Sequence, residues 1–195
     1  MIDPDYTNMY IGTSDGDTVM PGILRTVKNQ FKGNGYFGNS LNSSTKDELI
    51  YMLKNSDVFS AITHGSQTSI RLTGNVSFLV SDVNAFGSSD LNSLTFVYLG
   101  ACETGKGGAS ATNLVNAFYT KGVDNVVGFT ISVLVDETNF WTTKFMSNIA
   151  NGQSIATAIS NADYSIQNDP TLGGRSSYTI SSRLIKGPTS AIPCP

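Results

Sequence analysis

Short apolar runs that match β-strands alternate along this sequence with segments whose apolar residues recur at helical spacing. The strongest strand signal is residues 94–101 (LTFVYLGA), and helical spacing resumes soon after it, from Ala111 through Leu114, Val115 and Phe118. Strands that alternate with helices are typical of a parallel sheet covered by helices. The pattern therefore predicts an α/β fold.

The remaining elements follow from the same pattern. Ser44 to Glu48 carries the residues of a helix capping box, a hydroxyl side chain with a carboxylate three or four residues later. Two short β-rich pieces separated by Gly74-Asn75 predict a small hairpin beside the main sheet. The predicted strands are 8–13, 36–37, 57–63, 94–101, 125–131 and 178–185, the hairpin is 69–72 with 76–80, and the helices are 19–31, 46–53, 111–118, 136–152 and 153–166. These elements predict a three-layer sandwich of about six mostly parallel strands with helices on both faces.

The length of 195 residues suits one compact domain with a substantial core. We expect this domain to span residues 1–188, with residues 189–195 as a C-terminal tail. The formal net charge is only −3, so there is no electrostatic footprint for nucleic acid or for an anionic membrane surface. No stretch of 18 apolar residues is present either.

Charged residues make up 14% of the chain, below the usual share of about 25%, while Ser, Thr and Asn are frequent. An uncharged polar surface of this kind indicates an extracytoplasmic or secreted protein. The first residues, MIDPDYTNMY, lack the basic and apolar regions of a signal peptide. We therefore expect a domain excised from a larger parent chain.

Cysteine and histidine are scarce, and this limits the available chemistry. Cys102, Cys194 and His64 are the only such residues, too few for a four-ligand zinc cluster or a disulfide scaffold. Cys194 lies between two prolines in the expected tail. We expect no metal and no cofactor.

His64 and Cys102 each follow a predicted strand, 57–63 and 94–101. In open α/β sheets, ligands bind at the carboxyl ends of the strands. If these two strands are neighbours, about 5 Å apart, their terminal side chains face one crevice. A cysteine becomes a useful nucleophile when a nearby imidazole accepts or orients its proton. The alternative is an ordinary buried cysteine and an unrelated histidine, because free cysteine is among the most buried residue types.

Residues 99–105 (LGACETG), the His64-Gly65 pair after a strand and the Gly107-Gly108 turn before a helix resemble the CHAT family of caspase-like cysteine peptidases. The wider group contains caspase, separase, clostripain, gingipain and legumain. The resemblance extends over most of the chain, because residues 121–128 (KGVDNVVG), 135–137 (VDE) and 183–187 (RLIKG) match later strands and turns of that fold.

This resemblance implies a cysteine endopeptidase that acts on a protein or peptide substrate. Cys102 would attack the scissile carbonyl, and His64 would manage the proton on the leaving amine. The backbone amides of Gly65 and Cys102 would form the oxyanion hole, a type of site whose individual donors are typically worth about 10²- to 10³-fold in rate.

The resemblance also implies where the substrate side chain before the scissile bond (P1) binds. Those positions are here Asp15 and Asp17, Gly100, and the turn at Val135-Asp136. Clostripain and separase have an aspartate two residues before the cysteine, where this chain has Gly100. Basic P1 specificity then requires a carboxylate from Asp15, Asp17 or Asp136. Each aspartate also has a structural interpretation, as a turn residue or a helix-capping residue.

Two other functions remain open at this stage. A caspase-like domain without catalytic activity would serve as a protein-interaction module in a larger protein. A flavodoxin-like ligand-binding domain is a third interpretation, but residues 12–17 (GTSDGD) place carboxylates where a phosphate would bind. Many relatives cut themselves at a basic residue near the nucleophile, and Lys106 is the candidate for such a cut.

Overall fold

The computed structural model describes residues 8–12, 20–41, 44–172 and 182–190. Six of the described strands form one sheet in the order β2-β1-β3-β7-β8-β9. Their bounds are β1 (Asn8–Gly12), β2 (Phe37–Leu41), β3 (Val58–Ile62), β7 (Phe96–Gly100), β8 (Asn125–Phe129) and β9 (Arg183–Lys186). All neighbouring pairs are parallel except β8 and β9, which are antiparallel. The predicted sheet of six mostly parallel strands is confirmed.

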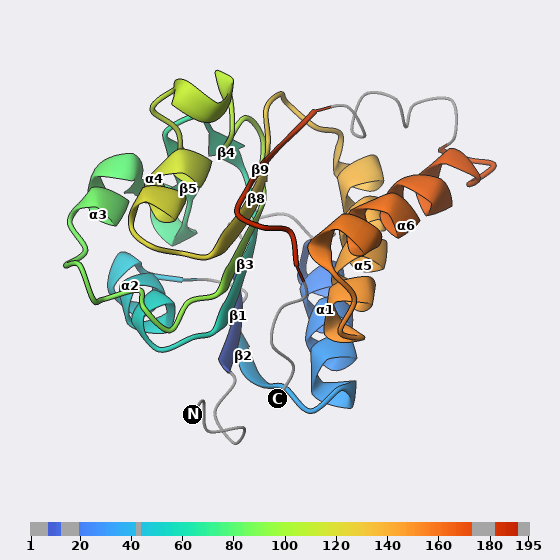
Figure 1. Cartoon of the computed structure of the whole chain (residues 1–195), viewed down its shortest axis with the longest axis horizontal. Coiled ribbons are helices and arrows are strands. Elements are labelled where there is room, and N and C mark those ends of the chain that lie inside the picture. Colours follow the sequence, from blue (N-terminus) through green and yellow to red (C-terminus); the bar gives the residue numbers. More distant parts are fainter. Residues whose placement is uncertain (1–7, 13–19, 42–43, 173–181, 191–195) are drawn as a thin grey trace.

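Helices cover both faces of this sheet, as Figure 1 shows. One layer contains α1 (Met20–Gly33), α5 (Val135–Ala150) and α6 (Ile155–Gln167), and the other contains α2 (Lys46–Lys54), α3 (Val80–Asn84) and α4 (Leu114–Thr120). The three-layer sandwich predicted from the sequence is therefore correct. Among the described residues, no helix has the length and hydropathy needed to span a bilayer.

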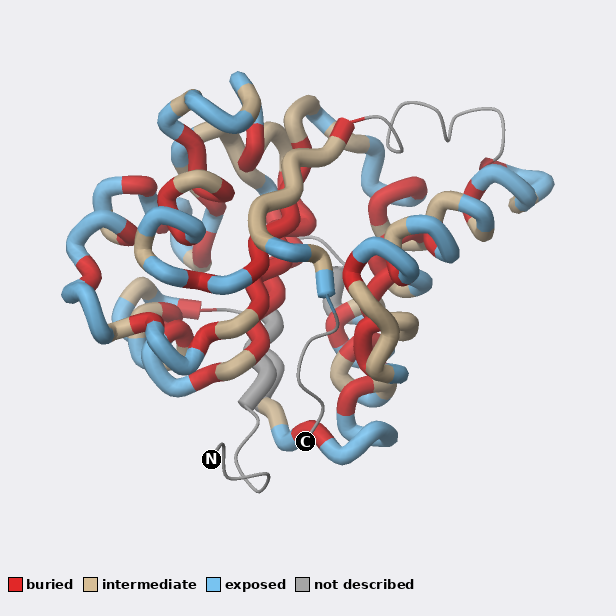
Figure 2. The backbone as a smooth tube through the Cα atoms, viewed as in Figure 1, coloured by how far each residue is buried: buried red, intermediate tan, exposed pale blue. Residues whose placement is uncertain are grey.

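The central strand β7 explains why the sheet needs both layers. All five of its residues are buried, and its side chains alternate between the two faces. Phe96 and Tyr98 belong to the core beneath α1, α5 and α6, whereas Val97 and Leu99 belong to the core beneath α2 and α4. Figure 2 shows the buried strands running between the exposed outer faces of the helices.

A second, small antiparallel sheet lies beside β3 on the α2–α4 side. It has the order β4-β5-β6, with β4 (Gly65–Ser66), β5 (Ser69–Arg71) and β6 (Ser77–Leu79). The predicted hairpin corresponds to β5 and β6, joined through the short 3₁₀ turn η2 (Thr73–Asn75). Another 3₁₀ turn, η3 (Gly108–Ser110), precedes α4.

The observed boundaries differ from the predictions at several elements. Strand 76–80 ends earlier than predicted, because Val80 begins α3 and Asp82 Oδ2 accepts a hydrogen bond from the Leu79 amide (2.7 Å). The weak strand predicted at 36–37 is the longer β2. Its Gly and Asn residues have low strand propensity, and β2 forms by pairing with β1 at the edge of the sheet. The capping box of α2 at Thr45 and Glu48 is confirmed.

The last predicted strand began at residue 178, and its described part starts at Arg183. Residues 178–181 lie outside the described residues. In the expected tail, Thr189 and Ser190 accept hydrogen bonds through their carbonyls from the first residues of α6, Ala156 and Ile155. The domain boundary at residue 188 remains a proposal.

Candidate active site

His64 follows β3 by two residues, and its backbone is held by two strands. The Thr63 amide donates to Gly100 O of β7 (3.4 Å), and the Arg71 amide of β5 donates to His64 O (2.9 Å). The Thr63 hydroxyl also donates to Arg71 O (2.8 Å). The main chain at His64 is thus fixed at the junction of the two sheets, while its imidazole is exposed.

Cys102 follows β7 by two residues, and β7 is the direct parallel neighbour of β3. The pairing register aligns Ile62 with Gly100, so His64 and Cys102 each lie two residues beyond the same rung of the sheet. The cysteine is a free thiol that is partly exposed. Its Sγ donates a hydrogen bond to Val133 O (3.8 Å).

The loop that carries Cys102 is attached to the end of β8. The Glu103 amide donates to Ile131 O (3.0 Å), and the fully buried Thr104 hydroxyl accepts from the Phe129 amide (3.3 Å). Glu103 adopts a left-handed backbone conformation, with φ of 61°. This conformation is unfavourable for a residue with a side chain and is concentrated at functional sites. The strained residue directly follows the candidate nucleophile.

His64 and Cys102 line the same small cleft. Its other walls come from Gly100 and from the region before and at the start of α5, including Val133 and Val135. The cleft therefore lies at the carboxyl ends of β3 and β7, where the α/β topology predicts a ligand site.

Thr138 and Asn139 line this cleft too, and sequence reasoning missed both. Their Oγ1 and Nδ2 atoms are buried and have no hydrogen-bond partner within the described residues. Buried polar atoms are seldom left without a partner, because this costs about 1–3 kcal/mol. A signal for them existed: they lie three and four residues after Val135, and this spacing places them on the same helix face as Val135.

Gly65 brings β4 unusually close to the cysteine loop. A Cβ at this position would lie 2.8 Å from Ala101 Cβ and 3.0 Å from Cys102 O. Gly65 pairs with Ile70 of β5. The hydrogen bond beside this pair runs between the neighbouring residues, from the Arg71 amide to His64 O. This is the pattern of a non-hydrogen-bonded pair, in which the Gly65 amide points away from β5.

Two of the predicted substrate-binding residues, Gly100 and Asp136, lie within the described part of the chain. Gly100 lines the cleft, and Asp136 is exposed at the start of α5, outside the residues that line it. Asp136 Oδ1 accepts a hydrogen bond from the Glu137 amide (3.0 Å), which is typical of a helix N-terminus. Asp15, Asp17 and the tail residue Cys194 lie outside the described residues.

The proposed cut site, Lys106, is exposed and forms an ion pair with Glu103 (3.0 Å). Cleavage after Lys106 stays a prediction. Within the described part of the chain, no three His, Cys, Asp or Glu side chains gather as a possible metal site.

Comparison with known proteins places this arrangement in a family. Residues 62–178 match the CHAT domain. The chain belongs to the CHAT domain family. The matched segment begins at the last residue of β3 and contains both His64 and Cys102, so the family resemblance inferred from the sequence is confirmed. No curated protein matches the sequence significantly.

Solved structures similar to this CHAT domain share its fold at low sequence identity. Gingipain R (RgpB), described as an Arg-specific cysteine proteinase, has a TM-score of 0.77 and 14% identity over 97% of this chain and 48% of its own. Separase of Saccharomyces cerevisiae, in complex with securin, has a TM-score of 0.54 and 14% identity over 93% of this chain and 12% of its own. Caspase-1 of Spodoptera frugiperda has a TM-score of 0.54 and 11% identity over 94% of this chain and 87% of its own.

These similarities show that the CHAT domain has a caspase-like fold, as predicted. The chain spans about half the length of gingipain R. At identities of 11–14%, the similarity concerns the fold alone.

Proposed function

We propose that this CHAT domain is a cysteine endopeptidase with a Cys102–His64 dyad. The observation that carries the proposal is the position of the two residues, each two residues beyond a paired rung of β3 and β7 and both lining one cleft. The only histidine of the chain thus shares a cleft with Cys102, the cysteine that follows β7. Fold similarity to a cysteine proteinase is consistent with this chemistry.

The reaction needs one proton relay. The Cys102 thiol transfers its proton to the imidazole of His64, and the thiolate sulfur attacks the carbonyl carbon of the scissile bond. The imidazolium then protonates the leaving amine as the C–N bond breaks, which leaves a thioester on Cys102. A water molecule, deprotonated by His64, hydrolyses the thioester, releases a carboxylic acid and restores the thiol.

The carbonyl oxygen becomes negatively charged in the tetrahedral intermediate, and the amides of Gly65 and Cys102 would stabilise it. The close approach of Gly65 to Cys102 O and the direction of the Gly65 amide away from β5 support this role. Gly100 and the start of α5, with Asp136, would receive the P1 side chain together with Asp15 and Asp17.

One observation favours the alternative of a protein-interaction module without activity. The Cys102 thiol donates to Val133 O, and no hydrogen bond joins it to His64 within the described residues. Peptidase activity therefore requires the thiol to rotate away from this carbonyl toward the imidazole when substrate binds.

The test is covalent labelling with acyloxymethyl ketone peptides that differ only at P1, followed by intact-mass measurement. The peptidase proposal predicts one adduct on Cys102 that is lost in Cys102→Ala and strongly reduced in His64→Ala. The preferred P1 residue would show whether a carboxylate from Asp15, Asp17 or Asp136 faces the substrate. Absence of an adduct from every probe, with the protein folded, would favour the interaction module.

A further inference from the structure

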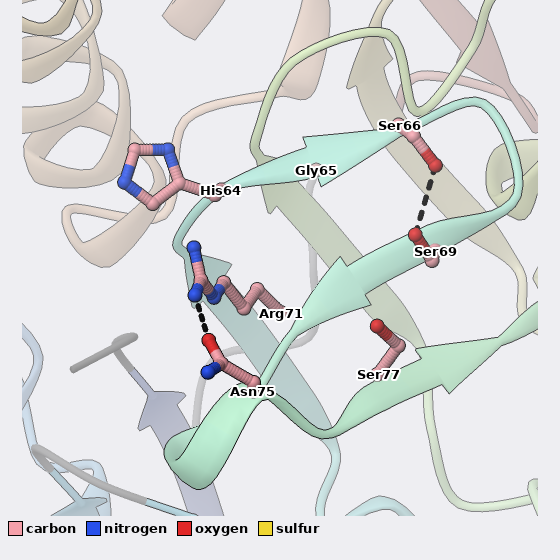
Figure 3. A pocket seen from close by; sticks show the side chains of 7 residues that line it. All are labelled: His64, Gly65, Ser66, Ser69, Arg71, Asn75 and Ser77. Carbon is pink, nitrogen blue, oxygen red and sulfur yellow. Dashed lines mark hydrogen bonds between the residues drawn. The ribbon is translucent and has the colours of Figure 1, made fainter.

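A second and larger depression lies on the other side of His64. It is an open groove of about 380 Å³ between His64 and the small sheet, and we call it the β4–β6 groove. Besides His64 and Gly65, it is lined by Ser66, Ser69, Arg71, Asn75 and Ser77 (Figure 3). His64 lines both this groove and the Cys102 cleft, so the two depressions meet at this residue.

The walls of this groove are suited to an anionic group. They carry three serine hydroxyls, one amide and one guanidinium, and no carboxylate comes from the described lining residues. Ser66 and Ser69 hydroxyls are hydrogen-bonded to each other (2.8 Å), which holds them on the groove surface. The single formal charge of the described lining is therefore the positive charge of Arg71.

Arg71 is positioned by an uncharged neighbour, the side chain of Asn75. Its Nη2 donates a hydrogen bond to Asn75 Oδ1, and Asn75 has a left-handed backbone (φ of 61°) just after Gly74. A guanidinium has five N–H donors in a planar fork, so most of them remain available. Among the described ion pairs none includes Arg71, whereas Lys46, Lys54, Lys106 and Arg183 each pair with a carboxylate.

The direction of the reaction determines which part of a substrate meets this groove. His64 protonates the leaving amine, so the residues after the scissile bond (P1′, P2′) leave on the imidazole side of Cys102. The β4–β6 groove is on the imidazole side, because His64 lines both the groove and the cleft whereas Cys102 lines only the cleft. Figure 3 shows the Arg71 guanidinium directed toward the His64 end of the groove, away from Ser66 and Ser69.

We propose that the β4–β6 groove binds a carboxylate within the first two residues after the scissile bond, and that Arg71 is the residue that recognises it. The inference rests on the proposed peptidase function. The carboxylate comes either from an Asp or Glu side chain at P1′ or P2′ or from a substrate C-terminus that ends there. Arg71 pairs with either source through the same guanidinium fork.

The test compares kcat/KM for matched quenched peptides in wild type, Arg71→Gln and Arg71→Glu. One series has Asp, Asn or Lys at P1′ or P2′ within a longer peptide, and a second ends at P2′ as an acid or an amide. We expect wild type to prefer the acidic member about fivefold, the gain of a strong exposed ion pair. The preference should disappear in Arg71→Gln and shift to Lys in Arg71→Glu. Whichever series shows the effect identifies the source of the carboxylate.

Lys54→Gln is the matched control, because it removes one positive charge from the chain outside the groove. It should keep the wild-type preference for the acidic peptide. Equal loss in Lys54→Gln and Arg71→Gln would mean that net charge alone sets the preference, and this would overturn the inference.

A binding measurement separates failure of this inference from failure of the proposed function. Fluorescence anisotropy of the same peptides on Cys102→Ala needs no turnover. Arg71-dependent binding of the acid without turnover by wild type would support the groove and contradict the peptidase. Turnover that is indifferent to the acid and to Arg71 would support the peptidase and contradict the groove. No Arg71-dependent preference in either assay overturns the inference.

Discussion

Gly65 is the point at which β4 passes closest to the loop that carries Cys102. In Gly65→Ala the new Cβ would lie 2.8 Å from Ala101 Cβ and 3.0 Å from Cys102 O, so the cysteine loop has to move. We expect kcat/KM to fall by about 100-fold, the typical effect of losing one oxyanion donor. Stability should fall by only about 1–3 kcal/mol, the usual cost of overpacking.

Gly22→Ala is the control for Gly65→Ala, because a Cβ at Gly22 of α1 would meet no described atom within 4 Å outside its chain neighbours and its own helix backbone. It should keep full activity and a similar or higher melting temperature, since alanine favours helix. Wild-type activity in Gly65→Ala would contradict the assignment of the Gly65 amide to the oxyanion hole.

Thr138 carries a different prediction, in which stability and activity change in opposite directions. Its hydroxyl is buried beside the cleft and has no hydrogen-bond partner among the described residues, so Thr138→Val removes an unsatisfied group while keeping the shape of the side chain. We expect the free protein to gain about 1 kcal/mol of stability. If substrate hydrogen-bonds to this hydroxyl, kcat/KM should fall about tenfold, measured beside thermal unfolding.

Thr142 provides the matched comparison one turn later on α5. Its hydroxyl is hydrogen-bonded to the buried Tyr98 hydroxyl (2.5 Å), and burial raises the pKa of Tyr98. Thr142→Val should therefore destabilise the protein by about 1–3 kcal/mol, because Tyr98 loses its partner. Destabilisation of both valine variants alike would show that Thr138 has a structural partner after all.

Strand β9 is joined to the helical layer by a largely buried ion pair. The Arg183 guanidinium makes two hydrogen bonds to the Asp163 carboxylate of α6 (2.9 and 2.7 Å), and Trp141 Nε1 of α5 donates to the same carboxylate (2.7 Å). Arg183 also lies over the Trp141 ring. Side chains from α5, α6 and β9 thus meet at one carboxylate.

Removing the Asp163 charge should destabilise the fold strongly. Asp163→Asn removes the charge of the carboxylate that pairs with the Arg183 side chain, which is only 8% exposed. We expect a loss of about 3–5 kcal/mol in the free energy of unfolding, measured by urea titration. Lys54→Gln, which breaks the more exposed Lys54–Asp90 pair, should cost less than about 1 kcal/mol. Similar effects of the two variants would contradict the structural role of the β9 ion pair.

The whole domain has two cores that share one sheet. Leu53 of α2 and Trp141 of α5 are both fully buried, on opposite faces. Because strands such as β7 contribute side chains to both cores, we expect the layers to unfold together. Leu53→Ala should lower stability by about 3 kcal/mol. The fluorescence of Trp141, the only tryptophan, should report the same shifted midpoint as circular dichroism.

A Trp141 transition that stays at the wild-type midpoint in Leu53→Ala would contradict this expectation. It would mean that the α1, α5 and α6 layer unfolds independently of the opposite layer.

Hydrophobic pattern alone was enough to predict the three-layer sandwich and the strand ends that carry His64 and Cys102. The reason is physical. A strand buried between two layers has to be apolar and a covering helix has to be apolar on one face, so each produces a recognisable hydrophobic pattern within a short stretch of sequence. Capping at Thr45 and Glu48 was equally predictable, because a capping box lies within four consecutive residues.

Tertiary structure alone decided which strands are neighbours, that β9 is antiparallel, and which side chains surround the dyad. Arg71 carried no recognisable signal, because a polar residue on a strand looks the same whether it faces water or a groove. The spacing of Thr138 and Asn139 places them on one helix face with Val135, but only the tertiary structure shows that this face borders a cleft. Their positions depend on the packing of α5 and of the small sheet against the ends of β3 and β7. Pairing between residues far apart in sequence is a property of the folded chain, and no local pattern encodes it.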